Sequence, residues 1–291
     1  MSQEKVKVLY ILSGGHSGST VLSLILGAAP EVFNAGELKF YSKHADRNFH
    51  RWSEVSNRCL CGRDALECPF WAQVEQAAPD LEIAYTPGIR GYLKGNFTRL
   101  NPDQSETSKA DTILFKQILE TAKTQEPCTR IILDLSKNIP RYLQLKANPD
   151  LDVTAIYLVR DGRGYLNSYR KRHQGGGLRW LLQWAVLNSA ILLHLTFRQD
   201  PYYKLSYDRF TQDPEKYLAE IRAEFGLSIP DNYVEAVNQT AFHLRAGNAA
   251  VIEKNTFAGL THDTSWQATL PTPLRWFAEL ITFPLNRLFG V

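Results

Sequence analysis

The chain lacks a strong excess of charge of either sign. Its 291 residues include 33 Lys and Arg against 30 Asp and Glu, which gives a formal net charge of +3. Nucleic-acid-binding domains carry a much stronger basic surface, so we expect no nucleic-acid partner. Hydrophobic residues make up 44% of the chain and charged residues 22%, which excludes wholesale disorder and provides enough apolar surface for a packed core.

Clear export and membrane segments are also missing. Residues 1–7 lack the apolar core and the cleavage site of a signal peptide, so we predict a cytoplasmic protein. Residues 180–197 carry no formal charge, but polar side chains interrupt them, so we predict a buried core helix rather than a transmembrane span. The apolar tail over residues 276–289 is predicted to dock as a helix, with a weak membrane contact as the alternative.

Cysteine is scarce. Three of the four cysteines, Cys59, Cys61 and Cys68, lie within ten residues of one another, and Cys128 lies far away. Zinc sites usually combine cysteine pairs into a set of four ligands, and this cluster offers three thiols, so we predict no metal site. A disulfide requires an oxidising compartment. Reduced structural thiols are the favoured interpretation, with a metal site and a disulfide as the alternatives.

Apolar strand candidates alternate with helix candidates along the chain. Strands are expected over residues 6–13, 130–135, 153–159 and 203–207, with a short one around 32–33. Helices are expected over residues 19–28, 110–124, 140–147, 164–172, 178–198 and 214–225. This alternation is typical of an α/β fold with a parallel sheet flanked by helices. We therefore predict a single domain over residues 1–291, with a P-loop-like sheet and an irregular insertion at about 40–108 that covers a site as a lid.

The first predicted strand ends in a loop of small residues. The sequence Gly14-Gly15-His16-Ser17-Gly18-Ser19-Thr20 then continues into an apolar helix. At such a junction, backbone N–H groups can close around an oxyanion at the helix N-terminus. A Walker A loop has a lysine after its last glycine, but Ser19 follows Gly18 here, which disfavours an NTPase or a P-loop kinase. The hydroxyls of Ser17, Ser19 and Thr20 still indicate an anionic ligand.

A basic cluster follows the fourth predicted strand. Arg160 ends that strand, Ser168 lies eight residues later in the next helix, and Arg172 lies four residues further on the same helix face. A loop that folds back would bring both side chains to one phosphate. Arg160 would donate charged, bidentate hydrogen bonds, and the hydroxyl of Ser168 would be a neutral donor. The alternative is a surface ion pair of Arg160 with Asp161 or Asp134. Two anion sites at strand ends indicate a ligand with two anionic groups, such as a nucleotide.

Together these two motifs resemble the sulfotransferases that use 3′-phosphoadenosine-5′-phosphosulfate (PAPS), among them the tyrosylprotein, carbohydrate and bacterial groups. The similarity covers residues 6–40 and 130–225 and, more loosely, the tail. It implies that the 5′-phosphosulfate is bound by the loop of Gly15, His16, Ser17, Gly18, Ser19 and Thr20. It also implies that the nucleotide and its 3′-phosphate are bound by Arg160, Ser168, Arg172 and Tyr207.

The resemblance also suggests catalytic residues. Glu37, after the first helix, matches a carboxylate that would take the acceptor's proton. Most relatives have lysine or arginine where His16 stands, so His16 would be a weaker and switchable cation. Lys137 is a second candidate for stabilising the charge on the leaving phosphate. The alternatives are structural roles: a loop-pinning Glu37, a capping His16 and a solvated Lys137.

The function implied by this resemblance is that of a PAPS-dependent sulfotransferase with a hydroxyl or amine acceptor of unknown identity. The alternative is a catalytically silent nucleotide-binding protein on the same fold, which is motivated by His16. No metal is required, because the cations named above can meet the charge of the ester. The oligomeric state is left open. The segments Cys68-Pro69-Phe70-Trp71 and His243 to Asn248 also resemble features of the bacterial group, with no role assigned to either.

Overall fold

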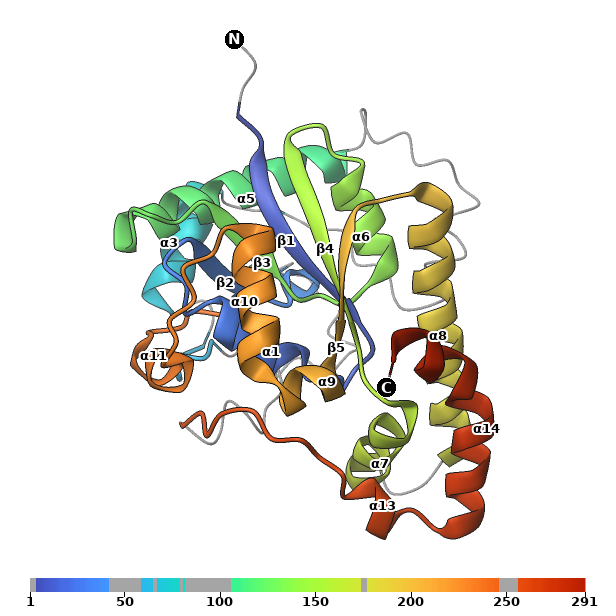
Figure 1. Cartoon of the computed structure of the whole chain (residues 1–291). Helices are drawn as coiled ribbons and strands as arrows, with labels where there is room; N and C mark the ends of the chain where they lie inside the picture. Colours follow the sequence, from blue (N-terminus) through green and yellow to red (C-terminus); the bar gives the residue numbers. More distant parts are fainter. Residues whose placement is uncertain are drawn as a thin grey trace.

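A five-stranded parallel sheet lies at the centre of the computed structural model (Figure 1). The strand order is β2-β3-β1-β4-β5, and each neighbouring pair is parallel. The strands are β1 (Val6–Ser13), β2 (Val32–Gly36), β3 (Ile131–Asp134), β4 (Leu151–Val159) and β5 (Tyr202–Ser206). The structure describes residues 4–41, 59–64, 67–78, 81, 106–173, 177–245 and 256–290. The predicted α/β fold with a parallel sheet in a single domain is confirmed.

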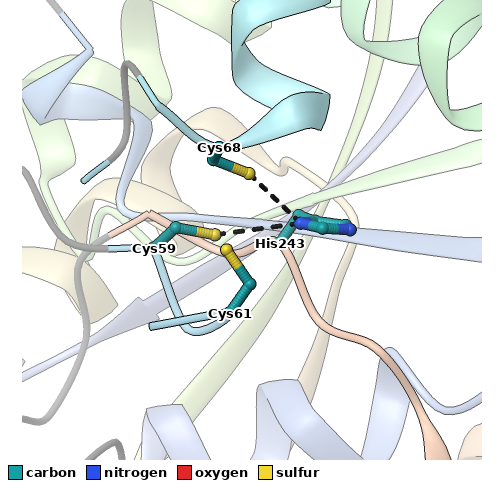
Figure 2. Close-up of side chains that lie close together, drawn as sticks. All are labelled: Cys59, Cys61, Cys68 and His243. Carbon is teal, nitrogen blue, oxygen red and sulfur yellow. Dashed lines mark hydrogen bonds between the residues drawn. The ribbon is translucent and has the colours of Figure 1, made fainter. Parts of the chain in front are cut away.

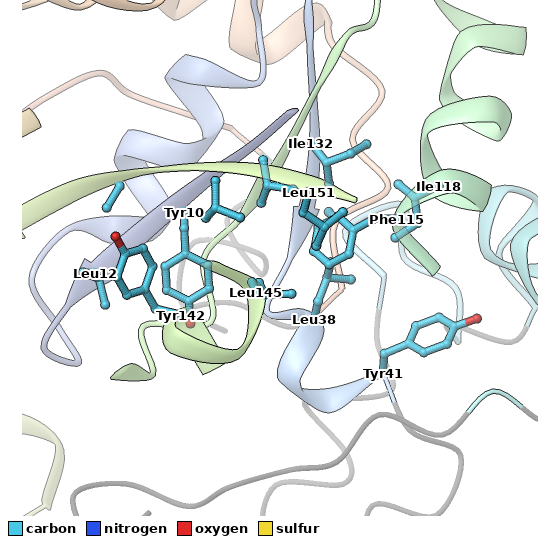
Figure 3. Close-up of a cluster of buried hydrophobic side chains, with 14 of the residues drawn as sticks. Tyr10, Leu12, Leu38, Tyr41, Phe115, Ile118, Ile132, Tyr142, Leu145 and Leu151 are labelled. Atoms are coloured by element: carbon cyan, nitrogen blue, oxygen red, sulfur yellow. The ribbon is translucent and has the colours of Figure 1, made fainter. Parts of the chain in front are cut away.

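Alternate side chains of β1 enter two different cores. Val8, Tyr10 and Leu12 belong to the core on one face of the sheet, which Figure 3 shows, and Leu9 and Ile11 belong to the core on the other face. Successive side chains of a strand point to opposite faces, so a strand covered on both faces is apolar at nearly every position. This property made β1 recognisable in the sequence, with the same bounds.

Helices cover both faces of the sheet. The face of Tyr10 packs against α3 (Pro69–Ala77), α5 (Glu106–Gln125), α6 (Ile139–Lys146) and α8 (Gly177–Arg198). The opposite face packs against α1 (Ser19–Leu26), α9 (Tyr207–Gln212), α10 (Pro214–Phe225) and α11 (Tyr233–Gln239). A short 3-10 helix, η1 (Leu38–Phe40), follows β2. The sheet is therefore a buried middle layer, and the ends of its strands are left for a site.

A group of helices extends from the β5 side of the sheet. It contains α7 (Gly162–His173), α8, α13 (Trp266–Thr269) and α14 (Thr272–Phe289). In Figure 1, α14 runs alongside α8, and it also contacts α7. The C-terminal tail therefore docks as a helix, as predicted.

One helix of this group, α8, is long and apolar enough to cross a membrane, but a single helix of this kind is weak evidence for a span. Trp184 and Leu195 on α8 are buried, whereas Leu182 and Phe197 are exposed. The prediction of a buried core helix is therefore correct for one face only. Contact of the tail with a membrane surface stays a prediction.

Several elements differ from the sequence-based prediction. Tyr207 begins α9 instead of ending a strand, because the hydroxyl of Ser206 accepts the N–H of Arg209 at 3.3 Å and caps the helix. The helix α3 lies inside the region predicted to be irregular, and α11 was not predicted. Most of the predicted insertion at 40–108, including its role as a lid, lies outside the described residues.

The backbone of Arg245 crosses the end of β2. Its N–H donates to the carbonyl of Ala35 at 3.1 Å, and its carbonyl accepts the N–H of Glu37 at 2.8 Å. Gly36 lies between these two bonds with a φ of +81°, and a Cβ on it would lie 2.0 Å from the carbonyl oxygen of Arg245. No side chain fits at this position, so the chain around Arg245 can reach the sheet only because residue 36 is glycine.

We expect Gly36→Ala to lower the free energy of unfolding by more than about 3 kcal/mol, because left-handed strain adds to an overlap with backbone atoms. Gly226→Ala is the matched control. Its φ is +61°, and the nearest atom to an added Cβ, on Arg130, lies 3.7 Å away. This control should lose only about 1 kcal/mol. Urea unfolding of both variants measures the difference, and equal losses would show that the close approach to Arg245 does not constrain the fold.

Candidate functional site

The loop between β1 and α1 leads into a helix whose first backbone N–H groups receive no hydrogen bond from an N-cap side chain. Gly18 is that N-cap residue, with a φ of 85°. The Ser17 hydroxyl donates to the Gly14 carbonyl at 2.6 Å and closes the loop. Ser19 and Thr20 are buried in the first turn of α1. The first N–H groups of a helix have no intrahelical acceptor and lie at its positive end, so this loop has the local geometry of an oxyanion site.

Two tyrosines pack directly on the glycines of this loop. A Cβ on Gly18 would lie 2.0 Å from Cε2 of Tyr207, and a Cβ on Gly15 would lie 2.7 Å from the hydroxyl oxygen of Tyr169. The ring of Tyr169 also contacts the ring of His16 edge-on, with centroids 4.5 Å apart. Gly18 is thus required by this close contact as well as by its backbone geometry, Gly15 leaves room for the Tyr169 hydroxyl, and the loop is held between α7 and α9.

Arg160 connects this loop with α7. Its Nη1 donates to the carbonyl of His16 at 3.1 Å and to the hydroxyl of Ser168 at 2.9 Å. The Arg160 side chain also lies over the ring of Tyr207, with 5.6 Å between Cζ and the ring centroid. Its Nε is buried without a hydrogen-bond partner in the described part of the chain. The structure thus brings together Arg160, Ser168 and Tyr207 from three separate elements.

The carboxylate that pairs with Arg160 is one that the sequence did not indicate. Nη2 of Arg160 lies 3.0 Å from Oδ2 of Asp263, whose side chain is 37% exposed. Asp161 instead pairs with Arg163 at 2.6 Å. The alternative of an ion pair between Arg160 and its neighbour Asp161 is therefore wrong. The side chain of Arg172, a further predicted contact, lies outside the described residues.

A second charged group forms where β2 and β3 end. Glu37 accepts hydrogen bonds from the ammonium groups of Lys39 at 2.7 Å and Lys137 at 2.8 Å. Burial by itself raises the pKa of this carboxyl, but the two ammonium groups outweigh burial and lower the pKa of Glu37 to about 2. Glu37 is therefore ionised at every physiological pH.

Buried polar contacts hold both lysines in place. The backbone N–H of Lys39 donates to the hydroxyl of Ser136 at 3.0 Å, and its ammonium donates to the carbonyl of Ser136 at 2.9 Å. Next to Lys137, the hydroxyl of Tyr10 donates to the Asn138 carbonyl at 2.9 Å and accepts the Asn138 N–H at 3.0 Å. These contacts fix the backbone on both sides of the ion pairs.

Asp134, at the end of β3, is a buried acid below this group. It accepts the backbone N–H of Ser136 at 2.8 Å. Burial raises its pKa to about 6 despite the nearby Arg141 and the hydrogen bonds from Ser136. Asp134 therefore organises the turn that carries Ser136 and Lys137, and it makes no contact with Arg160 that would support the predicted alternative pairing.

His16 and Lys137 share an uncommon backbone conformation. Their φ values are 58° and 59°, in the left-handed region that residues other than glycine seldom adopt. Each follows a strand, β1 or β3, and these two strands are neighbours in the sheet. The carboxyl ends of parallel strands meet at one edge, where α/β folds bind ligands. Backbone strain at such an edge is a common property of functional sites.

Sequence reasoning missed several residues around this edge. Lys39 had a visible signal, since it lies two residues after Glu37, but only η1 turns it back onto that carboxylate. Asp263 and Tyr169 had no signal beyond their residue type. His243 lay in a segment already noted as similar to the bacterial group, and it proves to contact Cys68.

Comparisons with known proteins agree with this fold. A family model described as "Sulfotransferase family" matches residues 9–231, a span that includes Glu37, Lys137, Arg160 and Tyr207. The sulfotransferase domain from the Synechococcus PCC 7002 olefin synthase superposes with a TM-score of 0.59 at 20% identity, covering 100% of this chain and 97% of that chain. The sulfotransferase domain from the curacin biosynthetic pathway gives a TM-score of 0.54 at 16% identity, covering 98% of this chain and 99% of that chain. No curated protein matches.

We expect Glu37→Gln to destabilise the fold in a pH-dependent manner. An acid whose pKa falls from 4.5 to about 2 on folding stabilises the native state fully above pH 4.5 and loses that contribution as the pH falls through 2. The variant should therefore lose up to about 3 kcal/mol near pH 7 and roughly half as much near pH 3.

Urea unfolding at both pH values measures this change, with Glu120→Gln as the control. Glu120 is exposed and pairs with Lys123 at 3.2 Å on the surface, so its loss should cost less than about 0.5 kcal/mol at either pH. A Glu37→Gln protein as stable as the wild type near pH 7 would contradict the stabilising role of this ion-pair group.

Proposed function

This chain belongs to the sulfotransferase family, and on that premise we propose that it moves a sulfuryl group from PAPS to a hydroxyl or amine group of an acceptor. The observation that carries the proposal is Arg160, because its guanidinium bonds both the His16 carbonyl of the first loop and the hydroxyl of Ser168. The loop and the Arg160–Ser168 pair are therefore adjacent, and each would take one anionic group of the same ligand. A nucleotide with a 3′-phosphate and a 5′-phosphosulfate meets that requirement.

The residues around Arg160 fit the 3′-phosphate. Nε of Arg160 is a buried donor without a partner in the described residues, and a phosphate oxygen would supply one. Ser168 adds a neutral donor beside the charged fork. Asp263, being more than a third exposed, can move away when a stronger anion arrives. The loop from Gly15 to Thr20 would take the phosphosulfate through its N–H groups and hydroxyls.

The donor would supply a sulfuryl group joined through oxygen to a phosphate. Transfer forms a bond from sulfur to the acceptor's oxygen or nitrogen and breaks the bond from sulfur to the phosphate oxygen. Glu37 is the carboxylate proposed to take the proton that the acceptor loses. Lys137, the loop N–H groups and a protonated His16 would neutralise the charge that develops on the leaving phosphate.

The ion pairs of Glu37 suggest how these two roles are linked. With both lysines bound, Glu37 is a weak base, because its pKa is about 2. An anionic ligand that draws Lys137 toward itself removes one of the two ammonium groups from Glu37. The proton affinity of Glu37 then rises, and the released cation is placed where the leaving group needs it. Nucleotide binding and activation of the base would therefore be coupled through Lys137.

We expect Arg160→Ala to weaken binding of 3′-phosphoadenosine-5′-phosphate about 10- to 100-fold, because a buried charged hydrogen bond contributes roughly 1.5–3 kcal/mol. Binding of AMP, which has no 3′-phosphate, should change little. Calorimetry with both nucleotides, on the wild type and the variant, measures how much of the affinity depends on the 3′-phosphate. Arg170→Ala removes the same charge from the partly exposed surface of α7 and should leave both affinities nearly unchanged. Equal binding of the two nucleotides by the wild type would overturn the two-anion site.

We expect Glu37→Gln to lower the rate of sulfuryl transfer by at least about 100-fold without weakening nucleotide binding, because the variant loses a proton acceptor and a competitor for Lys137 rather than a phosphate ligand. The measurement is release of the nucleotide product from PAPS with a panel of phenols, sugars and amines, with Glu120→Gln as the control. Near-normal rates would remove Glu37 from the mechanism. Nucleotide binding by the wild type without transfer to any acceptor would favour the catalytically silent alternative.

A further inference from the structure

Three thiols and one imidazole converge at a point that the proposed reaction does not use. Cys59, Cys61 and Cys68 come from the segment before α3, and His243 comes from the chain between α11 and Arg245 (Figure 2). Their sulfur and ring nitrogen atoms all lie within 4.8 Å of one another. Nδ1 of His243 lies 3.2 Å from Sγ of Cys68 and 3.9 Å from Sγ of Cys59.

We propose that Cys59, Cys61, Cys68 and His243 bind a structural zinc ion. Tetrahedral zinc has Zn–S bonds of about 2.3 Å and Zn–N bonds of about 2.0 Å, which places ligand atoms roughly 3.5–3.8 Å apart. The distances within the cluster lie on both sides of this value, so small side-chain rotations complete the tetrahedron. Four protein ligands leave no open position, which is typical of a structural site rather than a catalytic one.

The protons and charges involved in zinc binding can be accounted for in full. The three thiols release one proton each to solvent, the zinc ion stays divalent, and His243 binds as neutral imidazole through Nδ1. The bound site then carries a net charge of −1. No oxidant or reductant is needed, and all four cysteines of the chain are free thiols in the structure.

The surroundings of the cluster favour a site with negative charge. Arg245, two residues after His243, is only 5% exposed, and its Nε has no hydrogen-bond partner in the described part of the chain. Its guanidinium lies over the rings of Tyr41 and Trp71, at 5.0 Å and 5.5 Å from their centroids. The backbone of Arg245 also forms a bridge with that of Cys59. The carboxylates of Glu75 and Asp64 favour the charged form of this buried guanidinium. A zinc site with net charge −1 would add further opposing charge close by.

The site would tie two distant segments to the sheet. Leu60 N–H donates to the carbonyl of Leu244 at 3.1 Å, and the indole N–H of Trp71 donates to the carbonyl of His243 at 2.5 Å. The next residue, Arg245, holds the backbone of Glu37 through its carbonyl at 2.8 Å. Zinc would thus fix the segment from His243 to Arg245, which positions the backbone of Glu37. The metal site itself does not depend on the sulfuryl-transfer proposal.

The full-length protein, produced with zinc in the medium and purified without chelators, should contain about one zinc per chain by plasma mass spectrometry. Cys61→Ser and His243→Ala should lose most of this zinc, and Cys61 is exposed, so its substitution is the milder one. Cys128→Ser is the matched control, because Cys128 is also exposed but lies outside the cluster. Zinc far below one equivalent in the wild type, or full zinc in both cluster variants, would overturn the proposal.

Two measurements on the wild type avoid the risk that a variant fails to fold. With zinc bound, a thiol reagent should label Cys128 quickly and the three cluster cysteines slowly, and a strong chelator should make all four react. The same chelator should speed hydrogen exchange at Glu37 and Leu60 more than in β4. Equal labelling rates before chelation, or a disulfide within the cluster in nonreducing mass spectrometry, would contradict zinc binding. None of these readouts requires a nucleotide or an acceptor, so the outcome is independent of the activity assays.

Discussion

The crossing of the Arg245 backbone over Gly36 is the contact on which much of the site's arrangement depends. It extends the edge of β2 with a segment from late in the chain and bonds it on both sides of one glycine. One of these bonds holds the backbone of Glu37, the residue at the centre of the lysine group. The same segment carries His243 toward the three cysteines. Because residue 36 is glycine, the edge strand β2, the buried carboxylate of Glu37 and the thiol cluster can lie next to one another.

The basic side chains of the candidate site form ion pairs with carboxylates of the same chain. Glu37 holds two lysines, and Asp263 holds Arg160. A buried cation without a partner would be unstable or would lose its proton. The carboxylates of the chain itself orient the two lysines and the arginine through ion pairs. In the proposed reaction, an incoming anion would compete with a carboxylate for cations that are already oriented, so the site would be preorganised for that anion.

Local signals were sufficient for most of the fold and for part of the site. β1 and α10 have the bounds expected from the sequence, because continuous apolar character and a proline at a helix start are local properties. Arg160 and Ser168 were paired correctly because they lie eight residues apart, on a strand end and the next helix. The roles assigned to these residues, and to Glu37, His16 and Lys137, stay predictions. The contacts that sequence reasoning missed join distant parts of the chain: Asp263 with Arg160 across 103 residues, and His243 with Cys68 across 175.

The left-handed backbone at His16 and Lys137 has a consequence for how the chain tolerates change. Glycine would adopt these φ values readily, whereas a residue with a Cβ gives up roughly 1–2 kcal/mol of stability at each position. Substitution by glycine would therefore relieve the backbone while removing a basic side chain from the site. At Lys137 this relief is opposed by the loss of the ion pair with Glu37 at 2.8 Å, and at His16 by the loss of the ring contact with Tyr169. The left-handed φ is thus tolerated at these two positions because each side chain makes contacts that glycine would lose.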